Sequence, residues 1–303
     1  MNAINSSHEA IRADFSGLWV PLVTPFRAGS LDLPALKRLA THLAGQGLAG
    51  FVACGSTGEA AALDKAEQLA VLDTTLTAAR GLPVIMGVSG YHLGSTIEWV
   101  GQLCQRPIAG LLVPAPHYIR PSQAGLLHWF RSIADASRVP VIVYDIPYRT
   151  GCAIDLATML ALAVHPQIQA IKDCGGDALK TQALIADGRL QLLAGEDAQI
   201  FNAMALGASG AIAASAHVRT QEFAGLLQLV QTGQMAQARS SWWRLLPLIQ
   251  ALFVEPNPAP VKTLLASQGW LCDELRPPMQ STSAMLRVEL INKLPKEAQD
   301  GCA

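Results

Sequence analysis

The sequence predicts an α/β protein built on a (β/α)8 barrel, the TIM-barrel architecture, with a C-terminal helical appendage. Three observations predict it. Short apolar runs alternate with longer amphipathic segments from about residue 15 to residue 232. Eight such runs occur, the number that closes a parallel barrel, and the roughly 220 residues involved are an ordinary size for one. Beyond residue 233 the alternation stops and only helical periodicity continues.

The eight apolar runs are expected to be strands that are buried on both faces, and their strict alternation with helices predicts parallel pairing. An open doubly wound sheet is the alternative. It would carry a Gly-rich dinucleotide-binding turn after its first strand, where this chain has Thr24-Pro25-Phe26-Arg27. The runs cover residues 17–26, 50–55, 83–89, 110–114, 140–145, 170–173, 190–195 and 210–215.

Signals for helix starts lie between the strands. Asp32 stands just before a first turn that contains proline, which is typical of an N-cap. Asp64 precedes Glu67 by the three residues of a capping box. Ser122 and Asp155 also indicate helix starts.

Three regions follow from these patterns. Residues 1–14 are polar and predict a flexible tail, residues 15–232 form the barrel, and residues 233–303 form the helical appendage. The appendage is expected to cover the barrel or a neighbouring subunit, and Trp242 and Trp243 within it are interpreted as packing residues. Its expected helices span residues 235–253, 259–268 and 280–294.

The composition excludes several classes of protein. The chain has 303 residues, of which 50% are hydrophobic and 15% charged, and this excludes a disordered chain. The net charge of -1 gives no reason to expect nucleic acid or a membrane as partner. No apolar run reaches the roughly 18 residues that span a bilayer, so a soluble cytoplasmic protein is expected. The 6 cysteines form no C-x-x-C pair and the 7 histidines no ligand-like group, so no metal site is expected.

The active site of such a barrel lies at the C-terminal ends of its strands. Lys172 is the most informative residue there, because it follows Ala170-Ile171 in a strand that should be buried. A buried ammonium is costly, whereas a neutral amine can attack a carbonyl and form a Schiff base. An ion pair with Asp173 or with an acidic residue of a loop is an equally good explanation of its position alone. Most other lysines, Lys180 included, have polar helical surroundings that a solvated face explains, and Lys262 is an exception.

Two further strand ends carry three suitable features, although each alone is ambiguous. Tyr144 ends the strand next to that of Lys172, so its phenol could relay protons to a group on the lysine. The loop 55–59, Gly-Ser-Thr-Gly-Glu, offers two hydroxyls and backbone N–H groups to a carboxylate. Arg149 follows in the loop after Tyr144 and could clamp a second carboxylate, or simply be a surface arginine.

Taken together, these motifs resemble the dihydrodipicolinate synthase / N-acetylneuraminate lyase family of Schiff-base pyruvate enzymes. The resemblance runs in order from about Gly17 to the 290s. It rests on loop 55–59, Tyr118 with the Arg-Pro-Ser-Gln that follows, Tyr144 to Gly151, Ile171-Lys172-Asp173, Gly195-Glu196-Asp197 and Glu255 to Lys262.

The resemblance implies a role for each matching residue. Lys172 forms an imine with pyruvate, Tyr144 relays protons, and Thr57 links Tyr144 to Tyr118, which comes from a neighbouring subunit. The resemblance also implies substrate-binding residues, which are Ser56, Thr57, Arg149, Gly195 and Ile212. It implies no cofactor beyond the lysine imine, and a homotetramer built as a dimer of dimers.

The run from Tyr144 to Gly151 is similar to the synthase branch, in which an arginine takes the carboxylate of L-aspartate 4-semialdehyde. The implied reaction is a lyase-type condensation of that aldehyde with pyruvate to 4-hydroxy-tetrahydrodipicolinate, in lysine and diaminopimelate biosynthesis. The alternative is another pyruvate-dependent aldolase or lyase that acts on a sugar acid or hydroxy acid. It stays open because the amino-acid sequence of loop 55–59 also resembles the lyase branch. A non-catalytic keto-acid-binding paralogue is a third possibility, which the complete catalytic set disfavours.

Feedback inhibition by lysine is expected to be weak or absent. By resemblance, the effector site would include Lys65 and Ser95 at the dimer interface. Lys65 adds a charge of the same sign as the effector, and Ser95 lacks a carboxylate to pair its ammonium.

Overall fold

Eight parallel strands form a closed barrel in the computed structural model, which describes residues 12–293. β1 closes the barrel by pairing with both β4 and β10, in the register Gly17↔Gly210 on the β10 side. The predicted (β/α)8 barrel is therefore confirmed. The strands are β1 (Gly17–Pro21), β4 (Gly50–Ala53), β5 (Val84–Gly87), β6 (Gly110–Pro114), β7 (Val141–Asp145), β8 (Ile168–Asp173), β9 (Gln191–Ala194) and β10 (Gly210–Ile212).

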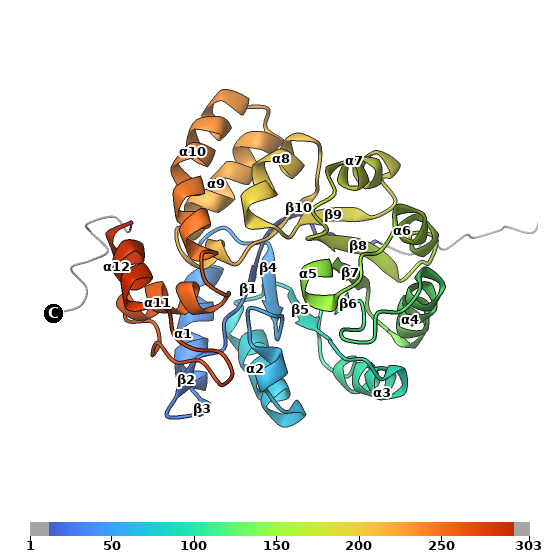
Figure 1. Ribbon diagram of the computed structural model, residues 1–303, viewed down its shortest axis with the longest axis horizontal. Helices are drawn as coiled ribbons and strands as arrows, with labels where there is room; N and C mark the ends of the chain where they lie inside the picture. The colour runs from blue at the N-terminus through green and yellow to red at the C-terminus, as the bar shows by residue number, and fades with distance from the viewer. Residues whose placement is uncertain (1–11, 294–303) are drawn as a thin grey trace, which may run out of the picture.

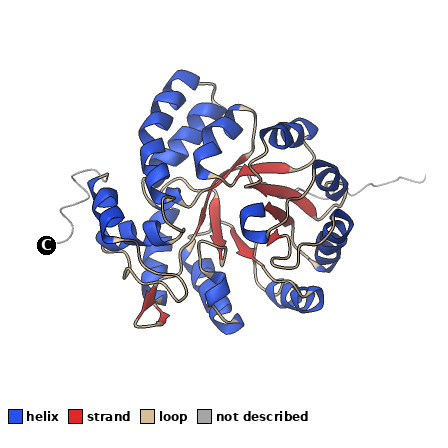
Figure 2. Ribbon diagram, viewed as in Figure 1, coloured by secondary structure: helices blue, strands red, loops and turns tan. Residues whose placement is uncertain are grey.

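Helices surround the strands as an outer layer, which Figure 1 shows in chain order and Figure 2 by secondary structure. The helices of the barrel are α1 (Leu33–Ala44), α2 (Lys65–Ala78), α3 (Leu93–Leu103), α4 (Gln123–Ala136), α6 (Leu156–Leu162), α7 (Ala178–Asp187), α8 (Ile200–Ala205) and α9 (Thr220–Gln231). Shorter turns are α5 (Pro147–Thr150) and the 3-10 turns η1 (Ala60–Ala62), η2 (Asp197–Gln199) and η3 (Ser215–His217).

Three of the four expected helix starts are capped as predicted. The Asp32 carboxylate accepts a hydrogen bond from the Ala35 N–H, and Asp64 forms both halves of a capping box with Glu67. The Ser122 hydroxyl accepts from the Gly125 N–H. Asp155 precedes its helix, but its side chain makes no cap bond.

The first strand is shorter than the sequence predicted. β1 ends at Pro21, and the chain then forms an antiparallel hairpin of β2 (Phe26–Arg27) and β3 (Ser30–Leu31). The hairpin turns at Ala28 and Gly29, which both have positive φ. The backbone N–H groups of these two residues donate to the Glu274 carboxylate, so the C-terminal region fixes the turn.

The C-terminal residues form α10 (Met235–Leu252), α11 (Ala259–Ser267) and α12 (Ala284–Asn292). These helices lie together on one side of the barrel, coloured orange to red in Figure 1. Trp242 is buried and stacks with Phe201, as expected of a packing residue. Trp243 is 62% exposed in the single chain, so its expected packing role stays a prediction. The two differ because adjacent residues on a helix point in directions about 100° apart.

Apolar side chains fill the barrel interior. Trp19 lies across the bottom, and its indole N–H donates to the Phe15 carbonyl at 2.8 Å. The ring fits because residue 50 is glycine, since a Cβ there would lie 2.3 Å from the Trp19 ring. The interior cluster includes Val52, Ile85, Leu112, Ile142, Ala170, Leu193 and Ile212. This packing closes the lower barrel and leaves the C-terminal ends of the strands for polar groups.

A buried histidine joins the last and first strand ends, and it predicts acid sensitivity. The Val23 N–H donates to Nε2 of His217, and Nδ1 of His217 donates to the Ala214 carbonyl. Burial lowers the pKa of His217 to about 4 from 6.5. The unfolded chain therefore binds a proton that the folded chain excludes. This group's contribution to stability is complete above pH 6.5 and is lost as the pH falls toward 4, by about 3 kcal/mol in total.

We expect His217→Gln to remove that pH-dependent part of the stability. The measurement is the free energy of urea unfolding of both proteins from pH 7.5 to pH 4.5. The difference between wild type and variant should shrink as the pH falls. A constant difference across this range would show that His217 does not cause this pH dependence. Other titrating groups are present in both proteins, so they cancel in the difference.

Candidate active site

Lys172 and Tyr144 stand side by side at the C-terminal ends of β8 and β7. The two strands pair in the register Tyr144↔Lys172. The Lys172 ammonium donates to the Tyr144 hydroxyl at 3.3 Å and lies 4.4 Å from the centroid of its ring. Both residues are buried, with 5% and 6% of their surface exposed. The barrel thus brings together the amine and the phenol that the sequence singled out.

Asp173 is held by other partners. Its carboxylate accepts from the Gly175 N–H at 2.9 Å and from the Thr181 hydroxyl at 2.5 Å. The recorded hydrogen bond of the Lys172 amine goes to Tyr144 instead. An ion pair of Lys172 with Asp173, one of the two partners considered in the alternative explanation, is therefore not what the structure shows.

The Tyr144 hydroxyl stays protonated at ordinary pH. Burial raises its pKa well above the usual value, and the neighbouring Cys174 and Tyr148 act in the same direction. A hydrogen bond from Ser56 and the charge of Arg149 oppose this shift. A neutral phenol both donates and accepts one proton, so Tyr144 is suited to pass protons rather than to act as a permanent base.

Ser56, rather than Thr57, is the hydroxyl beside Tyr144. Ser56 lies close enough to the phenol to lower its pKa, and it lines the cavity described below. Thr57 is buried, and its Oγ1 accepts from the Asn257 Nδ2 at 2.9 Å. The role predicted for Thr57, a link between Tyr144 and Tyr118, stays a prediction. Sequence reasoning gave no role to Asn257, although it lies in the motif Glu255 to Lys262.

A cavity of about 400 Å³ opens at this end of the barrel. Arg149 reaches it from the short helix α5, and Arg276 also lines it. The other polar residues of its lining are Ser56, Glu59, Ser89, His117, Tyr144, Thr150 and Asn257. Apolar walls come from residues such as Val88, Leu112, Ile146, Pro258, Pro277 and Met279. The volume suits two small carboxylic acids, and Arg149 provides a cationic group toward one of them.

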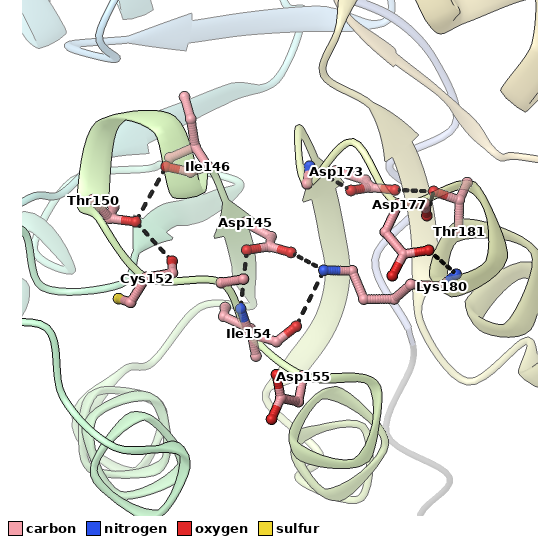
Figure 3. A network of polar contacts seen from close by, with 12 residues as sticks. Asp145, Ile146, Thr150, Cys152, Ile154, Asp155, Asp173, Asp177, Lys180 and Thr181 are labelled. Atoms are coloured by element: carbon pink, nitrogen blue, oxygen red, sulfur yellow. Dashed lines mark hydrogen bonds and ion pairs between the residues drawn. The ribbon is translucent and has the colours of Figure 1, made fainter.

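A buried polar network fixes the strand ends that carry the site (Figure 3). The Lys180 ammonium, on α7, donates to the Asp145 carboxylate at 2.5 Å and to the Ile154 carbonyl at 3.1 Å. The Ile154 N–H returns a hydrogen bond to Asp145. Asp145 follows Tyr144, and Ile154 ends the loop that contains Arg149. The network therefore joins β7, that loop and α7 into one unit.

The environment of Lys180 differs from the predicted solvated face. Its side chain is 6% exposed and that of Asp145 is fully buried. Burial raises the pKa of the Asp145 carboxyl, and the hydrogen bond and charge of Lys180 oppose the shift. The prediction for Lys180 was wrong because its partner lies 35 residues away in the sequence.

Gly195, directly after β9, leaves space for the Lys172 side chain. A Cβ at this position would lie 2.4 Å from the Cys174 Sγ and 2.8 Å from the Lys172 Cγ. We expect Gly195→Ala to displace the Lys172 side chain and to slow imine formation more than about 100-fold, since an error of about 1 Å in a reacting group has effects of this size. The rate at which pyruvate is trapped by borohydride measures it. An unchanged trapping rate in a folded variant would contradict this packing.

The remaining predicted residues lie in two different places. Ile212, at the end of β10, is buried in the interior cluster that also contains Tyr144. Tyr118 lies on the loop after β6 with a φ of 74° and is 89% exposed. A single chain therefore does not bring Tyr118 into the buried site, and its predicted role in a neighbouring subunit remains a prediction.

Two kinds of feature are absent from the described part of the chain. Among residues 12–293, no three His, Cys, Asp or Glu side chains gather as ligands for a metal ion. No helix within the same range is long and apolar enough to cross a membrane.

At the expected effector site, the Lys65 ammonium lies 5.3 Å from the centroid of the Trp99 ring. The Ser95 hydroxyl is near His92 Nδ1, at 3.0 Å.

Comparisons with known proteins agree with this geometry. The model of the dihydrodipicolinate synthetase family matches residues 14–296. The 4-hydroxy-tetrahydrodipicolinate synthase of Pelobacter propionicus is 36% identical over 268 residues, which are 88% of this chain and 92% of that protein.

Solved structures are similar over nearly the whole chain. The dihydrodipicolinate synthase of Acinetobacter baumannii, complexed with pyruvate, has a TM-score of 0.90 and 31% identity, covering 93% of this chain and 98% of that one. The enzyme of Cyanidioschyzon merolae, with lysine bound, has a TM-score of 0.90 and 28% identity, covering 96% of this chain and 100% of that one.

Proposed function

This chain belongs to the dihydrodipicolinate synthetase family, and from that premise we propose that it condenses pyruvate with L-aspartate 4-semialdehyde to 4-hydroxy-tetrahydrodipicolinate. The reaction belongs to lysine and diaminopimelate biosynthesis. The observation that carries the proposal is the buried amine of Lys172 held against the Tyr144 hydroxyl at the mouth of a barrel. Among the described residues this amine forms no salt bridge, and such an amine is suited to attack a carbonyl.

The first half of the reaction uses Lys172 and Tyr144. The Lys172 nitrogen attacks the keto carbon of pyruvate, and water leaves as the imine forms. Tyr144 passes the protons that this exchange requires, with Ser56 as its hydrogen-bonded neighbour. Ser56 and Thr57 hold the pyruvate carboxylate. Because the protonated imine accepts the electrons released when the methyl group loses a proton, the chemistry needs no further cofactor.

The second half depends on the acceptor. The enamine carbon attacks the aldehyde, and the new alkoxide takes a proton. Arg149 is suited to bind the acceptor carboxylate, since guanidinium and carboxylate pair through two hydrogen bonds. The acceptor amine then attacks the imine carbon, closes the ring and releases Lys172. The cavity of about 400 Å³ has room for both substrates.

The assembly belongs to the same proposal. We infer a cytoplasmic homotetramer, a dimer of dimers, in which Tyr118 of the partner subunit extends the proton path that Tyr144 and Ser56 begin. The exposure of 89% at Tyr118 supports this, because a tyrosine on a loop beside the site is available to another copy. Weak or absent inhibition by lysine completes the proposal, since Lys65 is a cation at the expected effector site.

A coupled assay tests the function. Purified protein is given pyruvate and L-aspartate 4-semialdehyde, and product is followed with a dihydrodipicolinate reductase. We expect turnover, a borohydride-trapped pyruvate on Lys172, and loss of turnover in Arg149→Ala with trapping retained. Trapping without turnover would overturn the proposed acceptor and direct the search to sugar acids. No trapping at all would overturn the Schiff-base chemistry.

A further inference from the structure

Arg149 and Glu196, which carry opposite charges, both influence the phenol of Tyr148. Tyr148 lies on α5, and the guanidinium carbon of Arg149 is 5.7 Å from the centroid of its ring. The charges of Arg149 and Glu196 act on the pKa of the Tyr148 phenol in opposite directions, because Glu196 raises it and Arg149 lowers it. Glu196 directly follows Gly195, and a Cβ on Gly195 would lie 2.8 Å from the Lys172 Cγ, so Glu196 stands next to the lysine in the chain and in space.

Glu196 has an unused acceptor. Its Oε1 atom is buried and has no hydrogen-bond partner among the described residues. Burial and the charge of Asp197 raise the pKa of the Glu196 carboxyl, whereas hydrogen bonds from Cys174 and Tyr148 and the charge of Lys172 oppose the shift. A buried oxygen without a partner is costly, so such an atom beside an active site indicates a donor that arrives with the substrate.

We propose that Glu196 binds the ammonium group of the acceptor while Arg149 binds its carboxylate, so that the site selects aldehydes that carry an α-amino acid end. This inference rests on the proposed function and adds the residue that recognises the amine. The ammonium and carboxylate of an α-amino acid are attached to one carbon, so a single group spans the two charges. Because Glu196 directly follows Gly195, which packs against the Lys172 side chain, an amine bound by Glu196 lies close to the imine that it must later attack.

Glu196→Gln tests the proposal because it keeps the size of the side chain and removes its charge. Two compounds are compared in the full-length enzyme. One is L-aspartate 4-semialdehyde, and the other is succinic semialdehyde, which has the same chain without the ammonium and is measured as a competitor. We expect the KM for L-aspartate 4-semialdehyde to rise at least tenfold, because a charge-assisted hydrogen bond is lost. The inhibition constant of succinic semialdehyde should change less than twofold.

Controls separate a specific role from a structural one. Glu289→Gln, at an exposed carboxylate of α12, should change neither constant. The borohydride-trapped pyruvate on Lys172 should form at the wild-type rate in both variants. An equal loss of affinity for both aldehydes in Glu196→Gln, or no change for either, would overturn the role of Glu196 alone. A wild-type enzyme that traps pyruvate but does not turn over L-aspartate 4-semialdehyde would overturn the proposed function and this inference with it.

Discussion

Lys172→Ala is expected to lower kcat by roughly 10⁴-fold or more, and borohydride should trap no pyruvate on the variant. The reason is that a covalent route is lost, and the amine that provides it is positioned by its hydrogen bond to Tyr144. Tyr144 and Ser56 would remain in place, but they can only move protons. Intact mass after reduction and the coupled assay give the two readouts.

Lys37→Ala is the matched control for this prediction, because Lys37 is exposed on α1. It should keep wild-type turnover and the full mass gain. A pyruvate adduct that persists on Lys172→Ala would show that another lysine carries the chemistry. Lys180 and Lys262 are the other buried lysines of the described chain, and peptide mapping would tell them apart.

Lys262→Met is expected to destabilise the protein by about 3–5 kcal/mol, because it leaves a buried carboxylate without its cation. Lys262 is fully buried and donates to the Glu59 carboxylate and to the Glu274 carbonyl. Burial lowers its pKa, and the charge of Glu59 opposes the shift. Urea unfolding at pH 7.5 measures the loss.

The double variant Glu59→Gln/Lys262→Met is the test of this explanation. It removes both charges, so it should recover most of the lost stability. Lys293→Met is the control, since its pair with Glu289 on the surface of α12 is worth less than about 1 kcal/mol. If the double variant were as unstable as Lys262→Met, the loss would come from packing around the methylene chain and not from the orphaned carboxylate.

The barrel could be predicted from the sequence because each of its parts is local. A run of apolar residues, a capping aspartate and a Pro-containing first turn each lie within a few residues, and the alternation of strands and helices limits the topology. The β2–β3 hairpin was missed because the Glu274 carboxylate that accepts from its turn comes from the far end of the chain. The first apolar run therefore looked like one long strand.

A site residue could be predicted where a charged side chain occurs in a segment that should be buried. Lys172, in a strand of apolar residues, is such a case. The choice between Ser56 and Thr57 is not, because both are hydroxyls in one loop and only the backbone conformation decides which faces Tyr144. Lys180 and Asn257 could not be assigned from local sequence, because their partners Asp145 and Thr57 are distant in the chain.

The hydrogen bond from Asn257 to Thr57 has a consequence for the order of events during synthesis, since the two residues are 200 positions apart. A growing chain contains all eight barrel strands once residue 212 has emerged. At that stage the loop 55–59 still lacks its partners Asn257 and Lys262. Contacts that distant in sequence form late, because the intervening chain must first be made and ordered. The strands of the barrel are therefore complete before loop 55–59 can gain these contacts, which require the chain up to residue 262.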